Sequence, residues 1–359
     1  MERLLAMPVT LADLADLAGV SRMTVSEVLR GVGRASPATR QRILGLAQEK
    51  GYRPNASARA VRTGRCGSIA LLASTMPNRT VLPSMLSDGV FNTLAQHDLY
   101  LTLVRLTDEL LTDDTYVPRI LREWACDGLL ISYTLKVPPR MVDLIEKYHI
   151  PSIWMNLKRT SDCVYADDLG AARTATRKLI DLGHHKVAYA DYQYGRGALD
   201  HYSAVDRQQG YELEMKAAGL TPVILRDIDP RRTDHYVAPP DFRGGRRLFY
   251  SLQWMSPKDR PTAVLTYGHE TAIPIMLAAE RLGIQLGAEF AMITFGDEPL
   301  WITSLGCTTM TLLNEDMGRQ AVAMLVEKIA NPQRRLLPQK VGYRLFTAQT
   351  TSTRFGWDL

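Results

Sequence analysis

Residues 9–30 read VTLADLADLAGVSRMTVSEVLR, and this stretch predicts two short helices joined by a tight turn. Thr10 is a good N-cap for the first helix. An apolar stripe follows at the spacing i, i+3, i+4 and i+7, formed by Leu11, Leu14, Ala15 and Ala18. Gly19 then ends the helix where left-handed backbone is needed, and Ser21 can cap the second helix almost at once. The pattern is typical of a helix-turn-helix.

A third helix is predicted to begin at Ser36 and Pro37, because serine at the N-cap and proline at the first helical position form a strong start signal. We expect this helix to bury Ile43, Leu44 and Ala47 and to end before Gly51. Three short amphipathic helices can form a small independent head.

The start of the second helix is the predicted DNA-reading surface, because this part of a helix-turn-helix reaches base edges in the major groove. Arg22 suits the O6 and N7 acceptors of guanine, Met23 suits a thymine methyl, and Ser26 lies one turn further along. Short polar side chains that can bind phosphate oxygens are Thr10, Ser21, Thr24 and Asn55. The alternative for Arg22 is a solvated helix residue without a partner.

Residues 52–64, YRPNASARAVRTG, follow the third helix and predict a short helix after the Asn55 cap. A segment of this length is too short to be a stable helix in water, so it suits a hinge that folds when docked. Its apolar residues Ala58 and Val61 can enter a minor groove, with Val61 as a wedge between base steps. The alternative is a flexible linker.

The charge of the chain is concentrated at its beginning. The whole chain of 359 residues has a net charge of +5, but residues 1–65 hold eleven Lys/Arg against five Asp/Glu, a net +6. A basic head on a neutral body is typical of a protein that binds a polyanion. No run of 18 apolar residues is present, and acidic residues interrupt any signal sequence, so we expect a cytoplasmic, nucleoid-associated protein without membrane contact.

Beyond residue 65 the chain alternates apolar runs with helical patterns, which predicts two doubly wound parallel sheets in an α/β body. The expected strands are Ile69–Leu72, Tyr100–Arg105, Gly128–Ser132, Ser152–Asn156, Val187–Ala190, Val223–Leu225, Ala263–Thr266 and Ala291–Phe295. The expected helices are Leu86–His97, Ala171–Leu182, Gln208–Ala218, Thr271–Leu282 and Met317–Ala330. Ligands of such sheets bind in the loops after the strands.

Several other chemistries lack support in the sequence. The four cysteines and seven histidines show no metal-ligand spacing, so no metal is expected. Gly-rich nucleotide loops and a Gly-x-Ser-x-Gly nucleophile motif are also missing, and no cofactor is expected. The carboxylate pairs Asp167-Asp168 and Asp297-Glu298 do not predict a glycosidase site, because nothing fixes a second acid opposite either pair.

These motifs together resemble the LacI/GalR family of transcriptional regulators. In the head the resemblance rests on Val9–Ala15, Gly19–Ser21, Thr24–Ser26 and Tyr52-x-Pro54-Asn55. In the body it rests on Asp127–Ser132, Ile150-Pro151, Asp181–His184, Arg207–Tyr211, Pro261–Val264, Asp297-Glu298 and Met317-Gly318. The resemblance covers nearly the whole chain, with its most specific part in the head.

The resemblance implies a helix-turn-helix head at 1–53, a hinge helix and linker at 54–65, and a two-lobed periplasmic-binding-protein-like domain at 66–359. It also implies a homodimeric repressor that binds a near-palindromic operator in double-stranded DNA. Its operator affinity would respond to a small-molecule effector, a sugar or sugar derivative, between the lobes. The candidate effector residues are Arg207, Asp297, Tyr192 and His269.

The sequence departs from the family pattern in the body and also in the head and hinge. Gly268-His269 replaces the usual Asn-Asp pair, which puts a common sugar ligand in doubt, and Glu27 replaces a basic residue in the head. Val61 stands where leucine is usual, which predicts a weaker DNA bend. Two further hypotheses remain, namely a sugar-binding protein without regulation and an enzyme with a DNA-binding head. No catalytic constellation supports an enzyme.

Overall fold

The computed structural model describes residues 9–75, 80, 82–107, 113, 115, 117–123, 125–191, 201–225, 260–352 and 356–357. The chain divides into two units, Met1–Cys66 and Gly67–Leu359, which we call the head and the body. Each unit contains hydrophobic clusters of its own, as expected for parts that fold separately.

Local capping signals define the helices of the head, which are α1 (Leu11–Ala18), α2 (Arg22–Leu29) and α3 (Pro37–Glu49). The Thr10 hydroxyl accepts the Asp13 N–H while the Asp13 carboxylate accepts the Thr10 N–H, which forms a complete capping box. Gly19 ends α1 with a φ of 63°. The predicted helix starts and the predicted turn are confirmed.

The three helices enclose one small core. Its buried members are Leu14, Ala15, Ala18, Val25, Val28, Ile43 and Ala47. Leu44 was expected in this core, and that expectation is wrong, because its side chain is 46% exposed. Leu44 is adjacent to the buried Ile43, and consecutive residues of a helix point in different directions.

A fourth helix, α4 (Ala56–Thr63), forms in the segment expected to be a hinge. The Asn55 side chain accepts the Ala58 N–H at 3.1 Å, which caps the helix, and Gly64 ends it with a φ of 67°. The chain then reaches the first strand of the body within four residues.

The first lobe of the body contains six described strands in the order β12-β5-β4-β3-β1-β2. Every strand pair in this sheet is parallel. The strands are β1 (Ser68–Ser74), β2 (Tyr100–Leu106), β3 (Gly128–Ser132), β4 (Ser152–Met155), β5 (Cys163–Ala166) and β12 (Gln339–Val341). The sheet is therefore completed by a strand from near the end of the chain.

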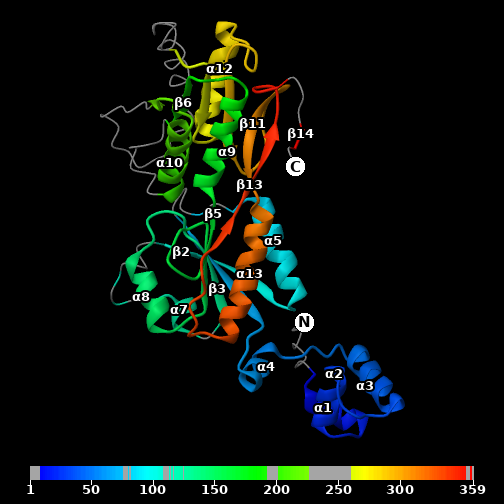
Figure 1. Cartoon of the computed structure of the whole chain (residues 1–359). Helices are drawn as coiled ribbons and strands as arrows, with labels where there is room; N and C mark the ends of the chain where they lie inside the picture. Colours follow the sequence, from blue (N-terminus) through cyan, green and yellow to red (C-terminus); the bar gives the residue numbers. More distant parts are fainter. Residues whose placement is uncertain are drawn as a thin grey trace, which may run out of the picture. The chain divides into compact units, whose positions relative to one another are not determined.

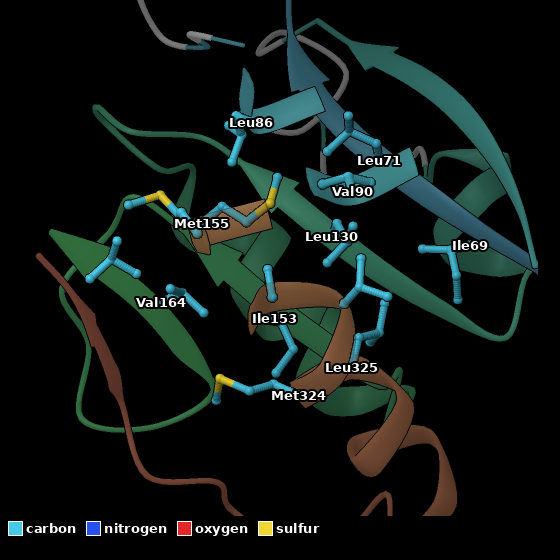
Figure 2. Packing of buried hydrophobic residues seen from close by; sticks show 14 of the residues in the cluster. Ile69, Leu71, Leu86, Val90, Leu130, Ile153, Met155, Val164, Met324 and Leu325 are labelled. Atoms are coloured by element: carbon cyan, nitrogen blue, oxygen red, sulfur yellow. The ribbon is translucent and has the colours of Figure 1, made fainter. Parts of the chain in front are cut away.

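Helices cover both faces of this sheet, as a doubly wound fold requires. On one face α5 (Ser84–Gln96) and α13 (Asn314–Ala330) pack side by side against the core (Figure 1). Figure 2 shows how Leu86 and Val90 of α5 and Leu325 of α13 meet Leu130 and Ile153 of the sheet. On the other face lie α7 (Arg119–Arg122) and α8 (Pro139–Lys147).

The second lobe contains a larger sheet with the described order β14-β13-β11-β9-β8-β6-β7, and β10 also pairs with β11. Its strands are β6 (Val187–Ala190), β7 (Val223–Leu225), β8 (Ala263–Thr266), β9 (Ala291–Gly296), β10 (Leu300–Ile302), β11 (Leu305–Leu312), β13 (Tyr343–Thr347) and β14 (Gly356–Trp357). The strands β7, β6, β8, β9 and β11 are parallel, whereas β10 and β13 run antiparallel to β11, and β14 runs antiparallel to β13. The predicted α/β class is confirmed, with this mixed edge as an addition.

Helices α9 (Asp168–Asp181) and α10 (Tyr202–Ala217) cover one face of the second sheet, and α12 (His269–Leu282) covers the other. In the described residues the chain passes between the lobes at three crossovers. The first crossover, residues 166–168, joins β5 to α9. The second, residues 312–314, joins β11 to α13, and the third, residues 341–343, joins β12 to β13. No helix of the described part is long and apolar enough to span a bilayer.

Candidate nucleic-acid interface and interlobe cavity

The residues predicted to read bases lie at the start of α2. Arg22 is the first residue of this helix and is exposed, and Met23 next to it is 70% exposed. Ser26 is half-buried one turn later. An exposed methionine on a short helix has no packing role in the head, so the geometry is compatible with contacts in a DNA groove.

The residues predicted to bind phosphate are placed at helix N-termini. Thr10, Ser21 and Asn55 each accept a backbone N–H and cap α1, α2 and α4. Thr24 shares a hydrogen bond of 2.9 Å with the Ser21 hydroxyl. Thr10, Ser21 and Asn55 therefore stabilise the helix starts, and the capping role that the sequence predicts for these three residues is confirmed.

The two predicted minor-groove residues lie on α4. Val61 is 87% exposed and Ala58 is also exposed. Covering an apolar side chain that is otherwise surrounded by water lowers the free energy, so the binding of a partner that buries Val61 would be stabilised. The position of Val61 is thus suitable for a wedge between base steps.

A cavity of about 320 Å³ lies between the two lobes of the body. Part of its lining comes from the segments after the strands β3, β4, β8 and β9, as predicted for an open α/β sheet, and part comes from helices such as α5, α10 and α13. First-lobe members are Pro83, Leu86, Thr134, Leu135, Asn156, Asn314 and Met317, and second-lobe members are Asp168, His201, Ser203, Arg207, Tyr267, Gly268, His269, Glu270, Phe295, Gly296, Asp297, Leu312 and Tyr343. The volume is within the range of small-molecule sites.

Arg207 forms the centre of a buried network at this cavity. Its Nε donates to Asp168 Oδ1 at 2.6 Å, and its Nη2 donates to the Tyr343 hydroxyl at 3.1 Å. The third donor group, Nη1, binds the Tyr267 carbonyl, and the guanidinium lies over the Phe295 ring at 4.3 Å. Burial alone would lower the pKa of Arg207, but the Asp168 carboxylate outweighs it and the pKa stays well above the ordinary range.

One oxygen of Asp168 has no hydrogen-bond partner. The Asp168 side chain is 1% exposed, and its Oδ1 accepts from both Arg207 and the Tyr343 hydroxyl. Its Oδ2 is buried and has no hydrogen-bond partner. A buried carboxylate oxygen without a donor is unfavourable, so a ligand hydroxyl at this position would gain a charge-assisted hydrogen bond.

A hydrogen-bond chain runs from the cavity to the other lobe through His201. The imidazole Nε2 is 2.9 Å from the Asn156 carbonyl, and its Nδ1 accepts the Ser203 N–H and lies 2.7 Å from the Ser203 hydroxyl. Because a carbonyl can only accept, His201 carries its proton on Nε2 and is neutral. Burial correspondingly lowers its pKa, although the bond to Asn156 opposes this shift. Ser203 in turn contacts the Tyr267 hydroxyl at 2.9 Å.

An ion pair provides a second link between the lobes. Lys158, which follows β4, contacts Asp206 of α10 at 2.7 Å. The same ammonium group lies about 6.0 Å from the Tyr202 ring. The first lobe therefore contacts the beginning of α10 through Asn156 and through Lys158.

Two of the remaining effector candidates, His269 and Asp297, line the cavity, and the third lies outside the described residues. His269 packs so closely on Gly296 that a Cβ there would lie 2.1 Å from its Nε2, and this buried Nε2 has no hydrogen-bond partner. Burial lowers the pKa of His269, with Glu270 acting in the opposite direction. Asp297 is exposed and accepts a hydrogen bond of 2.8 Å from Asn314. Tyr192 lies outside the described residues.

Sequence reasoning did not select Asp168, His201 or Tyr343 as binding residues. Asp168 had a usable signal, since it follows the strand Cys163–Ala166, but that strand was not predicted. Tyr343 contacts Asp168 across 175 positions of the chain, which no local pattern reveals. Among the described residues no cluster of His, Cys, Asp and Glu is arranged to hold a metal ion.

A helix-turn-helix head attached to a two-lobed α/β body with a cavity defines the class of ligand-responsive DNA-binding proteins. Comparison with known families agrees with this class. "Bacterial regulatory proteins, lacI family" matches residues 10–55, and "Periplasmic binding protein-like domain" matches residues 176–351. Two different parts of the chain thus match the two halves of one known architecture.

Curated relatives give the family. The chain is 31% identical over 294 residues to the HTH-type transcriptional regulator RafR of Escherichia coli, covering 80% of this chain and 81% of the relative. It is 28% identical to the regulator AglR of Rhizobium meliloti (strain 1021), with 81% and 78% covered. It is 27% identical to the ribose operon repressor of Escherichia coli (strain K12), with 90% and 94% covered. The protein belongs to the LacI family of transcriptional regulators.

Solved structures share the fold. The Lac repressor dimer bound to operator and the anti-inducer ONPF matches with a TM-score of 0.72 at 21% identity, covering 96% of this chain and 99% of that one. The complex of the transcriptional regulator CelR with cellobiose matches with a TM-score of 0.58 at 21% identity, covering 95% and 99%. The resemblance deduced from the head and the body motifs is therefore confirmed, and the chain is a DNA-binding transcriptional regulator.

Proposed function

We propose that this protein is a homodimeric repressor whose operator affinity is set by an uncharged carbohydrate in the interlobe cavity. The observation that carries the proposal is that Asp168, a residue of the cavity lining, has a buried Oδ2 without a hydrogen-bond partner. A sugar hydroxyl is a suitable donor for this oxygen, and Phe295, Leu312 and Met317 supply the apolar surface that a sugar ring also needs.

The charge of the cavity favours a neutral ligand. Arg207 is already paired with Asp168, so it offers no uncompensated positive charge. Glu270 and Asp297 add two carboxylates to the lining, and burial lowers the pKa of both His201 and His269. A phosphorylated or carboxylated sugar would lose its hydration without gaining a counter-ion, which is costly.

Related regulators agree with this ligand class. One fold neighbour is described with cellobiose and another with ribose, both of which are neutral sugars. The ribose operon repressor is also among the relatives. These proteins support a carbohydrate effector without naming the one used here.

The proposed mechanism couples the cavity to the hinge. A ligand that contacts both lobes and the crossover residues Asp168, Asn314 and Tyr343 favours one arrangement of the lobes over another. The first lobe begins a few residues after α4, so its rotation would change how two hinge helices pair in a dimer. Coupling of about 1–3 kcal/mol would change operator affinity roughly 5- to 150-fold.

The proposed domain division is a head at 1–53, a hinge at 54–65 and an effector and dimerisation domain at 66–359. Two heads would occupy major-groove half-sites about 10 bp apart in a near-palindromic operator. Ser26 joins Arg22 and Met23 in reading bases, and the paired hinges present Ala58 and Val61 to the minor groove. We place the protein in the cytoplasm on the nucleoid, and the cavity binds its ligand without transforming it.

The first experiment selects bound duplexes from a random DNA pool at fixed salt, with and without mixed neutral sugars. A palindromic motif whose recovery changes with a neutral sugar pool is the expected result. A response only to phosphorylated sugars would overturn the neutral class, and salt-dependent binding without any motif would overturn the repressor. Consumption of a sugar in a turnover assay would favour the enzyme hypothesis instead.

A variant pair locates the effector site. Asp297→Asn keeps the size of an exposed side chain at the cavity and should weaken the sugar response without changing operator affinity. Asp316→Asn removes a carboxylate from the exposed part of α13, where it pairs with Arg319, and serves as the matched control. Equal responses of the two variants would remove Asp297 from the site.

A further inference from the structure

A second hollow adjoins the interlobe cavity on the side of β10. It has a volume of about 510 Å³ and is lined by Leu82, Pro83, His269, Asp297, Glu298, Pro299, Leu300 and Trp301. Pro83, His269 and Asp297 also line the interlobe cavity. The two cavities therefore meet at these three residues.

Trp301 is held in a defined position at the outer hollow. It lies on β10, and its ring packs against Phe346 with the centroids 6.0 Å apart at an interplanar angle of 62°. Gly306 is its partner in the antiparallel ladder, and a Cβ at Gly306 would lie 2.9 Å from the indole. The indole is thus supported by the second sheet, yet the residue remains 43% exposed.

The chemistry of the outer hollow fits a sugar ring. A pyranose presents apolar C–H groups on one face, which stack on an aromatic ring, and hydroxyl groups at its edge, which donate to carboxylates. Trp301 provides the aromatic surface, whereas Asp297 and Glu298 provide exposed carboxylates next to it. An apolar or aromatic ligand would not form hydrogen bonds with these two carboxylates, and an anionic ligand would be repelled by them.

We propose that the effector is an oligosaccharide of at least two sugar units, with one unit in the interlobe cavity and the next unit stacked on Trp301. This inference rests on the proposed carbohydrate effector and adds its minimum length and a second binding site. Trp301 then acts as a specificity-determining residue, because it contacts only ligands that are longer than one ring.

The test measures binding of neutral sugars to the full-length protein by titration calorimetry. The probes are the disaccharides cellobiose, maltose, lactose, melibiose and sucrose, together with glucose, galactose and fructose. At least one disaccharide is expected to bind about tenfold or more tightly than each of its component monosaccharides. Trp301→Ala should remove that advantage, a loss of about tenfold, while monosaccharide affinity changes less than about twofold.

Two further variants separate a binding role from a structural one. Trp301→Phe keeps an aromatic surface and should retain most of the disaccharide affinity. Tyr148→Ala removes another half-exposed aromatic residue, 44% exposed and remote in sequence from the site, and should change nothing. A Trp301→Ala protein that loses monosaccharide and disaccharide binding equally would overturn the proposal.

The failures of the two proposals are distinguishable. If monosaccharides bind as tightly as every disaccharide, the outer site is wrong and the carbohydrate effector stands. If a disaccharide binds more tightly but Trp301→Ala keeps the full advantage, Trp301 is not the outer site. If no sugar of either length binds, the carbohydrate class itself is contradicted.

Discussion

The Arg207 guanidinium donates to Asp168 across 2.6 Å and thereby ties α10 to the first crossover between the lobes. Through the Tyr343 hydroxyl the same guanidinium also reaches the third crossover. Arg207 thus joins α10 to two of the crossovers between the lobes, and in the proposed site it would act on an effector through Asp168. Because the pair is buried, its removal affects stability as well as ligand response.

Arg207→Ala is expected to lower the free energy of unfolding of the body by about 3–5 kcal/mol, because it leaves the buried Asp168 carboxylate without its cation. The double variant Arg207→Ala with Asp168→Asn should recover part of this loss, since the uncompensated charge is then removed. Urea unfolding followed by circular dichroism measures both. A double variant that is no more stable than Arg207→Ala would contradict the charge argument.

Arg22→Ala is expected to cost about 1–3 kcal/mol of operator binding and to relax the base preference at one position of each half-site. Its exposed place at the start of α2 leaves the fold of the head unchanged. Binding to an operator and to each single-base variant of it measures the effect. Arg34→Ala, in the exposed loop before α3, is the control and should weaken all sequences alike if it has any effect. A uniform loss for Arg22→Ala would mean that it contacts only phosphate.

Val61→Ala should weaken operator binding by about 1.5 kcal/mol, or roughly tenfold, through the loss of two buried carbon atoms at the DNA. Thermal stability should not change, because Val61 is 87% exposed in the absence of DNA. Leu337→Ala removes another exposed apolar side chain, 80% exposed, and should leave operator affinity unaltered. Equal effects of the two substitutions would argue against a wedge.

The stability of the body should depend on pH through its buried histidines. Burial lowers the pKa of His201 and His269 below 6.5, so the unfolded chain binds more protons than the folded chain in that range. The free energy of unfolding should therefore fall as the pH decreases through 6.5 toward the lowered pKa values of the folded state. His201→Gln retains a donor for the Asn156 carbonyl without a titratable ring, so its stability should fall less steeply. An unchanged slope would exclude His201 as a contributor.

Gly89→Ala should destabilise the first lobe by about 1–3 kcal/mol or more. A Cβ at Gly89 of α5 would lie 2.1 Å from the Glu315 carbonyl of α13, which is backbone and cannot rotate away. Gly45→Ala in α3 is the matched control, because its Cβ meets nothing within 4 Å and the helix gains propensity. Urea unfolding should show opposite signs for the two variants. A stabilising Gly89→Ala would mean that the two helices separate easily.

The head was predictable because its signals are local. Thr10, Gly19, Ser21 and Pro37 each act within three or four residues of themselves. The burial of Leu44 was the exception, because it depends on which side of α3 faces the other helices, and this is a tertiary property. Most strands of the body were also predicted, because many of them, such as β3, β4 and β8, are buried on both faces and appear as continuous apolar runs.

The strand β11 could not be predicted, because its sequence LGCTTMTL has the polarity of a loop. Thr308 and Thr309 are nevertheless fully buried. The Thr308 hydroxyl bonds to the Ala348 carbonyl and to Thr351, about 40 positions away, and these partners compensate the burial. In the cavity, the contact between Asp168 and Tyr343 could not be predicted either, because the two residues are far apart in the chain. Arg207 and Asp297, in contrast, belong to short motifs that can be read directly from the sequence.

The placement of β12 and α13 in the first lobe also determines when the molecule becomes complete during synthesis. The head is finished once its 66 residues have left the ribosome, so it can fold early. The first lobe must wait for residues up to Val341, long after its first five strands have emerged. Of its described strands, the second lobe then lacks only β13 and β14. Both lobes therefore mature almost together, once residues 339–357 have emerged, and a nascent chain can present a folded DNA-binding head before it is able to sense a ligand.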